Sequence, residues 1–474
     1  MRQLTSLDAQ FLALETPRQA GHVGGLGIVD PSTRPDRTFD CAAVKKLLRE
    51  RLPLLPPFRW RLVEVPFGLD YPYWVEDEDF DLDFHVREIA LPRPGNDQQL
   101  AEQVARIFSR PLDRARPLWE VYVIDGLESG NVAALTKIHH AVIDGLSGAE
   151  IMGLLLDMKP EGRDLPAVTE SDGATHKPGE LSMLARGLLG VPRYPLRALR
   201  SLPRAVPNIE ETPLATLPGA GTVGRVAGRL LGRGSQGPGL RAPRTLFNGR
   251  VSPHRRFVFG KLPLDEVKAV KNAHGVTVND VVVSICAGAV RRWLVEHDDL
   301  PDEPLVAQIP VSVRGEDEVG TFGNRIMLMS APLFTNEADP VERLTLHHEA
   351  LSDMKERHKA LPAELLQDVN HFIPPAVFSR AARATFALST TVGRPAWNLV
   401  ISNVPGPQLP LYLAGARLMA NYPVSVITDG MGLNITVMSY DGDCDFGIVG
   451  DRDQMPDLWS LMDWLGEELE ALKR

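Results

Sequence analysis

Two adjacent histidines followed by an aspartate and a glycine form the most chemically distinctive segment of this chain. The residues are His139, His140, Asp144 and Gly145, and an apolar, partly β-branched run precedes them. Adjacent side chains on an extended backbone point in opposite directions, so only one imidazole can readily face a given substrate. The glycine permits backbone geometry that other residues resist. Such an arrangement can orient an imidazole and keep one ring nitrogen available as a base near neutral pH.

No activated protein nucleophile of a recognisable kind accompanies this base. The segment Gly145-Leu146-Ser147-Gly148 lacks the spacing of a nucleophile elbow, and Cys286 falls in an apolar helical pattern that is typical of a buried, inert thiol. We therefore favour direct attack on an activated acyl carbonyl by a substrate hydroxyl that His140 deprotonates. A purely structural histidine pair stays open as an alternative, as does a metal site, which the divergence of adjacent histidines disfavours. A second pair, His347-His348, lies in a helical stretch without a following Asp-Gly, and we interpret it as structural.

The residues around the first pair predict a β-hairpin followed by a helix. Residues 121–124 and 132–138 are apolar runs, and Glu128-Ser129-Gly130-Asn131 between them has turn chemistry. The second strand would run directly into the histidine pair. Ser147 would then cap a helix with apolar residues from Ile151 to Leu155.

The second half of the chain also alternates between helical and strand patterns. A helix is predicted from Leu264 to Ala273, with Gly275 ending it, and Thr277-Val278-Asn279-Asp280 has the pattern of a capping box that opens an apolar helix through Trp293. Further strands are predicted at 305–311, 398–401, 434–440 and 446–449, and a closing helix at 459–472. The last two strands would pair across the turn Asp441-Gly442-Asp443.

Composition and charge divide the chain into two folded parts and a basic connection. The chain has 474 residues, 44% of them hydrophobic, and a net charge of −10. Residues 181–256 hold thirteen arginines against two glutamates, a net charge of +11, so the remainder carries −21. We expect mixed α/β domains at 1–159 and 256–474, joined by a linker at 160–255 that is rich in Pro, Gly and Arg.

The basic linker predicts an anionic partner. Arg193, Arg197, Arg200 and Arg204 recur at helical spacing and alternate with leucines, as in an amphipathic helix, although prolines interrupt the pattern. No apolar run reaches the roughly 18 residues of a membrane span, and the N-terminus lacks the pattern of a signal peptide. Three widely separated cysteines, Cys41, Cys286 and Cys444, fit a reducing cytoplasm.

Taken together, the motifs resemble the bacterial wax ester synthase/acyl-CoA:diacylglycerol acyltransferase family. The histidine segment resembles the signature of a superfamily that includes chloramphenicol acetyltransferase, carnitine acyltransferases and peptide-synthetase condensation domains. Further segments resemble the narrower family, in its order along the chain: 7–11, 14–17, 22–25, 117–119, 279–280, 310–314, 323–324, 403–407 and 433–437. Residues 160–250 match no motif of that family.

The resemblance implies two chloramphenicol-acetyltransferase-like domains with a tunnel between them. Acyl-CoA and the alcohol would enter from opposite mouths, and triacylglycerol or a wax ester would be the product. His140 would be the general base. Asp144 would be mainly structural, paired with Arg314 or, as the reserve candidate, Arg61. No cofactor is implied beyond acyl-CoA, which is a substrate.

The resemblance also assigns supporting and substrate-contacting roles outside the histidine segment. The supporting residues would be Asn279, Asp280 and Arg314, and the substrate-contacting residues Pro117, Leu118, Trp119 and Asn403. Plain structural interpretations stay open: helix capping for Asn279-Asp280, core packing for Pro117-Leu118-Trp119, and a rigid turn for residues 403–407.

Other classes of function compete with this assignment. His139 and Asp144 also satisfy the H-x-x-x-x-D spacing of membrane glycerol-phosphate acyltransferases, but no Pro-Glu-Gly segment follows and the second histidine would have no role. A condensation domain would be expected beside carrier or adenylation domains. A non-enzymatic coat or binding protein of lipid inclusions would equally use the basic linker. We expect a cytoplasmic protein, peripheral on the inner membrane face or on lipid inclusions through residues 181–256, and no nucleic-acid partner.

Overall fold

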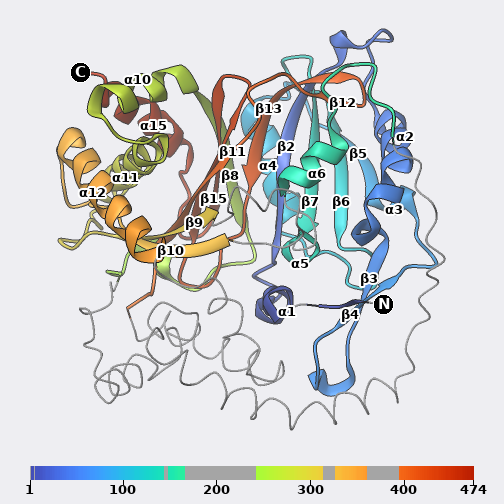
Figure 1. Ribbon diagram of the computed structural model, residues 1–474, viewed down its shortest axis with the longest axis horizontal. Coiled ribbons are helices and arrows are strands. Elements are labelled where there is room, and N and C mark those ends of the chain that lie inside the picture. The colour runs from blue at the N-terminus through green and yellow to red at the C-terminus, as the bar shows by residue number, and fades with distance from the viewer. Residues whose placement is uncertain (1, 5, 144–147, 166–241, 313–325, 360–393) are drawn as a thin grey trace.

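The chain forms two six-stranded mixed sheets, which lie next to each other in the computed structural model (Figure 1). The structure describes residues 2–4, 6–143, 148–165, 242–312, 326–359 and 394–474. The mixed α/β class expected from the sequence is therefore confirmed. Of the linker, only residues 160–165 and 242–255 are described, so the four arginines at 193, 197, 200 and 204 lie outside the described residues.

The first sheet has the strand order β12-β13-β2-β7-β6-β5, in which only β5 and β6 pair in parallel. Its strands are β2 (His22–Asp30), β5 (Val86–Ala90), β6 (Trp119–Asp125), β7 (Val132–His139), β12 (Tyr412–Leu413) and β13 (Ala416–Val424). The predicted hairpin is confirmed as β6 and β7, with Trp119 opposite Ile138. Because the central strand β7 ends at His139, the histidine pair lies at the end of that strand.

Helices cover both faces of this sheet. They are α1 (Ser6–Leu14), α2 (Cys41–Arg51), α3 (Leu82–His85), α4 (Asp97–Phe108), α5 (His140–Ile143) and α6 (Gly148–Leu155). On one face, Leu100 and Val104 of α4 share a core with Leu26 of β2. On the other face, α2 and α6 pack against β6 and β7. A small sheet of β1 (Arg2–Gln3), β4 (Tyr73–Glu76) and β3 (Trp60–Val63) lies beside them.

The second sheet has the strand order β10-β9-β11-β14-β15-β8. Its strands are β8 (Arg255–Pro263), β9 (Val306–Ser312), β10 (Ile326–Pro332), β11 (Leu399–Pro405), β14 (Leu433–Tyr440) and β15 (Asp443–Asp451). The strands predicted from the sequence are all present, and β14 and β15 form the predicted hairpin. The helices of this half are α10 (Leu264–His274), α11 (Val278–Glu296), α12 (Pro340–Lys359) and α15 (Trp459–Leu472).

Local sequence signals explain the helix ends of the second half. Gly275 ends α10 with a φ of 70°, a left-handed conformation that glycine adopts without a side-chain clash. Thr277 caps α11, and its side chain accepts from the Asp280 amide while the Asp280 carboxylate accepts from the Thr277 amide. The predicted capping box is thus confirmed. Among the described helices none could span a membrane alone; α10 and α11 meet the length and hydropathy criteria only as a pair bent by 103°.

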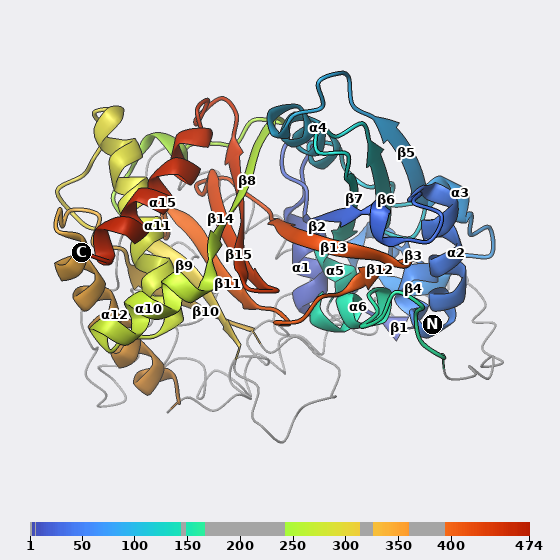
Figure 2. The ribbon, with the colours of Figure 1, turned by 90° about the horizontal axis from the view of Figure 1, so that it is seen from above.

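Strands β12 and β13 come from the second half of the sequence but belong to the first sheet. Figure 2 shows β13 running across from the second half to the first sheet. There it pairs with β2 in an antiparallel register. The main-chain N–H of Asn421 on β13 also donates to the buried carboxylate of Asp445 on β15 (2.6 Å). Side chains from α4, β8, β13 and β15 share one core. The two halves are therefore interlocked, which boundaries drawn along the sequence did not anticipate.

Candidate active site

His139 is buried, and each of its two ring nitrogens lies close to a polar group of a neighbouring residue. It lies opposite His22 in the β2–β7 pair and is 1% exposed. Its Nδ1 accepts from the main-chain N–H of Ala141 (3.1 Å). An imidazole nitrogen that accepts carries no proton, so the proton is on Nε2, which lies 3.1 Å from Oε1 of Glu15. With both nitrogens engaged, His139 is suited to holding the site together.

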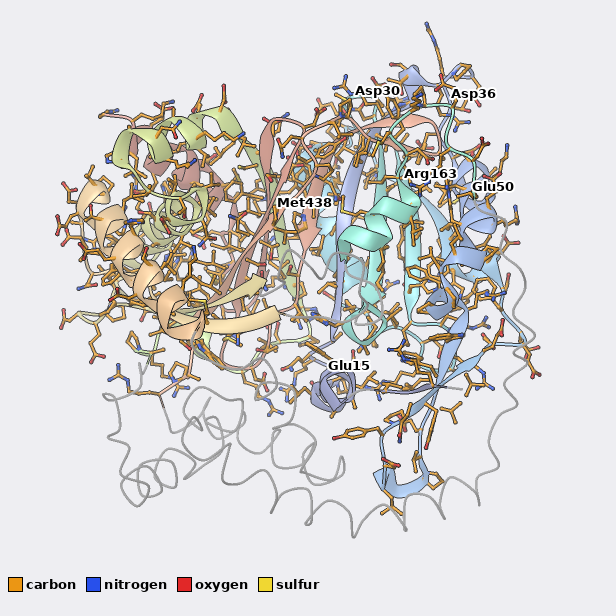
Figure 3. The ribbon with its side chains drawn as sticks, in the orientation of Figure 1. Glu15, Asp30, Asp36, Glu50, Arg163 and Met438 are labelled. Atoms are coloured by element: carbon orange, nitrogen blue, oxygen red, sulfur yellow. The ribbon has the colours of Figure 1, made fainter. Side chains whose placement is uncertain are left out.

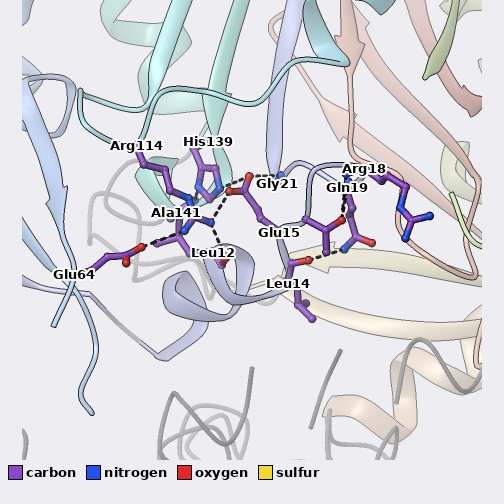
Figure 4. A network of polar contacts seen from close by, with 11 residues as sticks. Leu12, Leu14, Glu15, Arg18, Gln19, Gly21, Glu64, Arg114, His139 and Ala141 are labelled. Carbon is purple, nitrogen blue, oxygen red and sulfur yellow. Dashed lines mark hydrogen bonds and ion pairs between the residues drawn. The ribbon is translucent and has the colours of Figure 1, made fainter. Parts of the chain in front are cut away.

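Glu15 is the centre of the polar network around His139 (Figure 4). Its Oε1 accepts from the Gly21 amide (2.7 Å), and its Oε2 accepts from Arg114 (2.7 Å). Burial by itself would raise the pKa of Glu15, but the contacts with His139, Gly21 and Arg114 outweigh it and lower the pKa to about 2. Glu15 is therefore a carboxylate at neutral pH, and it holds the His139 ring in place. Figure 3 places Glu15 beside α1, whereas Asp30 and Asp36 lie at the other end of β2.

Gly21 makes room for this network. A Cβ atom added to Gly21 would lie 3.1 Å from Nε2 of His139 and 3.6 Å from Oε1 of Glu15, closer than ordinary contact in the first case. The Gly21 carbonyl also accepts from the main-chain N–H of His140 (2.8 Å). Through its backbone alone, Gly21 thus bonds to Glu15 with its amide and to His140 with its carbonyl.

His140 is the first residue of α5, and its backbone turns away from the strand that ends at His139. Its ring stacks on Phe11 of α1, with centroids 3.8 Å apart and planes inclined by 15°. Stacking holds the face of an imidazole, whereas its nitrogens accept protons in the plane of the ring. The contact with Phe11 therefore fixes the orientation of His140 in a manner compatible with a general base.

The segment Pro117-Leu118-Trp119 supports the strand end from the other side. The Leu118 carbonyl accepts from the His139 amide (2.9 Å). Trp119 is fully buried, and its indole N–H donates to the Phe58 carbonyl (2.8 Å). Pro117 forms an isolated bridge with Arg61. These contacts favour the packing interpretation of the segment, and its contact with substrate stays a prediction.

The second half contributes a cluster in which two of the predicted residues meet. The side-chain amide of Asn403 on β11 lies 3.4 Å from the side-chain oxygen of Asn279 on α11. Asp280 is buried, and besides capping α11 its Oδ2 lies 2.8 Å from Nδ1 of His348 on α12. The structure thus brings Asn279 and Asn403 together and gives Asp280 a capping and bridging role. His347 is fully buried, and burial lowers its pKa to about 4, which fits the structural interpretation of that pair.

Several predicted residues lie outside the described residues: Asp144, Gly145, Ser147 and Arg314. The pairing of Asp144 therefore stays a prediction. Arg61, the reserve partner, has its Nε 3.5 Å from a carboxylate oxygen of Asp77. Cys286 is fully buried in α11, and burial raises the pKa of its thiol, which disfavours it as a nucleophile.

Phe11 and Glu15 contact the histidine pair, and sequence reasoning missed both. Both fall within N-terminal segments that carried the family resemblance, yet no role was assigned to either. The histidine that each contacts, His140 for Phe11 and His139 for Glu15, lies more than 120 positions further along the chain. The local signal is a glutamate a few residues before a glycine-containing strand, and it does not identify a partner histidine.

Comparison with known proteins places this geometry in a family. Residues 4–282 match the model of the wax ester synthase/diacylglycerol acyltransferase catalytic domain, and residues 322–473 match the model of the WS/DGAT C-terminal domain. The O-acyltransferase WSD of Acinetobacter baylyi is 34% identical over 100% of this chain and 97% of its own length. A Mycobacterium tuberculosis protein assigned as a diacylglycerol O-acyltransferase is 37% identical over 100% of this chain and 90% of its own.

Solved structures agree with the sequence comparison. The wax ester synthase/diacylglycerol acyltransferase from Marinobacter aquaeolei VT8 is 32% identical, with a TM-score of 0.71 over 100% of this chain and 99% of that chain. The first condensation domain of the calcium-dependent antibiotic synthetase shares the fold at 16% identity, with a TM-score of 0.56 over 99% of this chain and 96% of that one. The chain therefore belongs to the wax ester synthase/diacylglycerol acyltransferase family and is an acyltransferase of that family.

Proposed function

We propose that this protein transfers a fatty acyl group from acyl-CoA to the hydroxyl of a diacylglycerol or a long-chain alcohol. The observation that carries the proposal is the division of roles between the two histidines. His139 is buried at the end of β7, where its Nδ1 accepts from the Ala141 amide and its Nε2 lies 3.1 Å from Glu15, whereas His140 begins α5, is half-buried and stacks its ring face on Phe11. The relatives named above act as acyltransferases, and the family name includes both classes of acceptor.

In the proposed reaction His140 is the general base. It accepts the proton of the substrate hydroxyl while the hydroxyl oxygen attacks the thioester carbonyl carbon. The tetrahedral intermediate then collapses and the bond between carbon and sulfur breaks. The leaving thiolate of CoA accepts the proton that His140 took from the alcohol. Oxygen replaces sulfur on the acyl carbon without a bond to the protein, so an ester and free CoA are the products.

The experiment that tests the function is an assay of the purified protein with palmitoyl-CoA. Hexadecanol and dioleoylglycerol are offered in parallel, and ester formation is followed together with release of free CoA. Formation of wax ester, triacylglycerol or both supports the proposal and ranks the two acceptors. Free CoA released at the same rate with and without an acceptor, and no ester, would identify a thioesterase instead.

Direct transfer predicts that no acyl-enzyme accumulates. When the protein is mixed with palmitoyl-CoA and no alcohol, its intact mass should stay unchanged, because Cys286 is buried with a raised thiol pKa and no protein nucleophile is proposed. Intact mass spectrometry over the time of several turnovers measures this. A stoichiometric increase by one palmitoyl group, traced to Ser147 or Cys286, would replace direct transfer by a two-step mechanism.

We further propose that the protein works at a lipid surface, on the inner membrane face or on lipid inclusions. Thirteen arginines against two glutamates in residues 181–256 support this. Each basic residue near an anionic surface contributes about 1 kcal/mol to the free energy of membrane binding. The wild-type protein should float with phosphatidylglycerol vesicles at low salt and detach as salt rises. Replacing Arg193, Arg197, Arg200 and Arg204 by glutamine should weaken flotation and spare turnover of a short, water-soluble alcohol. Unchanged flotation would mean that these arginines pair with the acidic body of the protein.

A further inference from the structure

A hollow of about 720 Å³ opens where α4 and β8 meet, at the junction of the two halves. Figure 2 shows α4 beside β8, and the main-chain N–H of Arg255 donates to the Ser109 hydroxyl just beyond the end of α4 (3.1 Å). The charged residues that line the hollow are Arg106, Arg110, Arg255, Arg256, Arg452 and Glu102. Five arginines thus face a single carboxylate, in a protein whose net charge is −10.

Two of these arginines have carboxylate partners at the rim. Arg106 lies 3.6 Å from Glu102, and Arg452 lies 3.6 Å from Asp453. Within the part of the chain that the structure describes, no carboxylate pairs with Arg110, Arg255 or Arg256. The Nε of Arg256 is buried, and no described residue accepts a hydrogen bond from it. Unbalanced positive charge of this kind, partly withdrawn from water, favours an anionic ligand.

Arg255 is held in place by main-chain carbonyls of two segments. Its guanidinium donates to the main-chain carbonyls of Ser252 and Arg18, and burial lowers its pKa, although Asp451 and Asp429 act in the opposite direction. An arginine stays protonated despite such a shift. Both of those carboxylates accept hydrogen bonds from main-chain N–H groups: Asp451 from that of Ser252, and Asp429 from that of Val251. They therefore temper the positive charge of the hollow without pairing directly with Arg255.

An aromatic ring completes the wall. Trp459, the first residue of α15, borders this hollow and a neighbouring shallow one, and both are also lined by Gln98. Its ring packs edge-on against Phe259, with centroids 6.0 Å apart. A half-exposed indole beside several guanidinium groups offers a flat surface for a planar ring next to donors for phosphate oxygens.

Residues at the hollow are hydrogen-bonded to segments that flank the histidine pair. At the end of α4, the Phe108 carbonyl accepts from Nε2 of the buried His22, which lies opposite His139 in the sheet. The Arg255 side chain reaches the carbonyl of Arg18, in the segment between Glu15 and Gly21. A ligand held at the arginines would therefore contact residues that are bonded to the framework of the candidate base.

We propose that this hollow binds phosphate ester groups, with guanidinium groups on the phosphate oxygens. Acyl-CoA carries such groups at its nucleotide end, and phospholipids carry them in their headgroups. The first source rests on the proposed function, because it makes the hollow the recognition site for the CoA portion of the donor substrate. Arginine pairs suit phosphate because their planar donor geometry matches two phosphate oxygens at once.

The test is the double variant Arg110→Gln/Arg256→Gln, which removes two positive charges and keeps the main-chain contacts of Arg255. The matched control is Lys46→Gln/Arg49→Gln, the same loss of charge on the exposed side of α2. Binding of CoA and of pantetheine, which lacks the phosphates and the nucleotide, is measured by calorimetry. Flotation with phosphatidylglycerol vesicles is measured beside flotation with neutral vesicles. Turnover of palmitoyl-CoA is compared with turnover of palmitoyl-pantetheine.

If CoA is the ligand, the double variant should bind CoA about ten- to a hundredfold more weakly than the control variant does. Its KM for palmitoyl-CoA should rise in parallel, while turnover of palmitoyl-pantetheine stays at the control level. If a headgroup is the ligand, CoA binding is unchanged and flotation with anionic vesicles falls below that of the control. If the double variant and the control variant bind CoA equally well and also float equally with anionic vesicles, the proposal is overturned. Ester formation by the wild type remains a separate readout, so the site can fail while the proposed function stands.

Discussion

The variant His140→Ala is expected to lose acyl transfer, with kcat lowered by about 10²–10⁴. The hydroxyl of an alcohol is a poor nucleophile until a base accepts its proton. Of the two adjacent imidazoles, His139 contacts Glu15, so His140, stacked on Phe11, is the ring to which we assign that role. Initial rates of ester formation from palmitoyl-CoA and hexadecanol measure the loss. The melting temperature should stay near that of the wild type, because His140 is only half-buried.

Two further histidine variants separate chemistry from folding. His139→Ala should lower stability first, because it leaves the carboxylate of Glu15, whose side chain is only 13% exposed, without its imidazole neighbour. His274→Ala is the matched control: it removes an imidazole that contacts the Leu472 carbonyl on the far side of the second sheet. It should retain wild-type rates. Equal loss of activity in His139→Ala and His140→Ala, with both variants folded, would mean that the base has been assigned to the wrong ring.

Patterns that are local in sequence predicted much of the fold. The β6–β7 hairpin follows from two apolar runs around a turn-forming tetrapeptide, and the start of α11 follows from the capping box at Thr277. The ends of such elements depend on residues a few positions apart, so the chain itself specifies them. The position of the histidine pair at a strand end was predictable for the same reason.

Contacts between distant segments were not predictable in this way. The apolar alternation of residues 416–424 indicates a strand, but nothing in it selects β2 as the partner in the other half of the molecule. In the same way, Glu15 gives no sign that it will meet His139, because a carboxylate near the N-terminus is as suited to solvent as to a buried network. Burial decides between the two outcomes, and burial is a property of the assembled sheets and helices.

The variant Glu15→Gln is expected to lower the free energy of unfolding by about 3 kcal/mol at pH 7. The native state holds the Glu15 carboxylate with a pKa of about 2, against an ordinary value of 4.5. Because the folded-state pKa is depressed, the contribution is fully present above about pH 4.5 and is lost as the pH falls toward 2. Urea unfolding of both proteins at pH 7, 5, 4 and 3 measures this, and the difference in stability between them should shrink over the lower half of that range.

The matched control is Glu64→Gln, because Glu64 contacts the other arm of the same arginine. Its carboxylate lies 3.2 Å from Arg114 but is 66% exposed, against 13% for Glu15. An exposed ion pair of this kind contributes at most about 1 kcal/mol to the free energy of unfolding, and salt screens it. Glu64→Gln should therefore unfold nearly as the wild type does. Other carboxylates titrate in all three proteins alike, and comparing the variants isolates Glu15. A stability gap for Glu15→Gln that stays constant from pH 7 to pH 3 would show that shape, and not charge, makes Glu15 important to the His139 network.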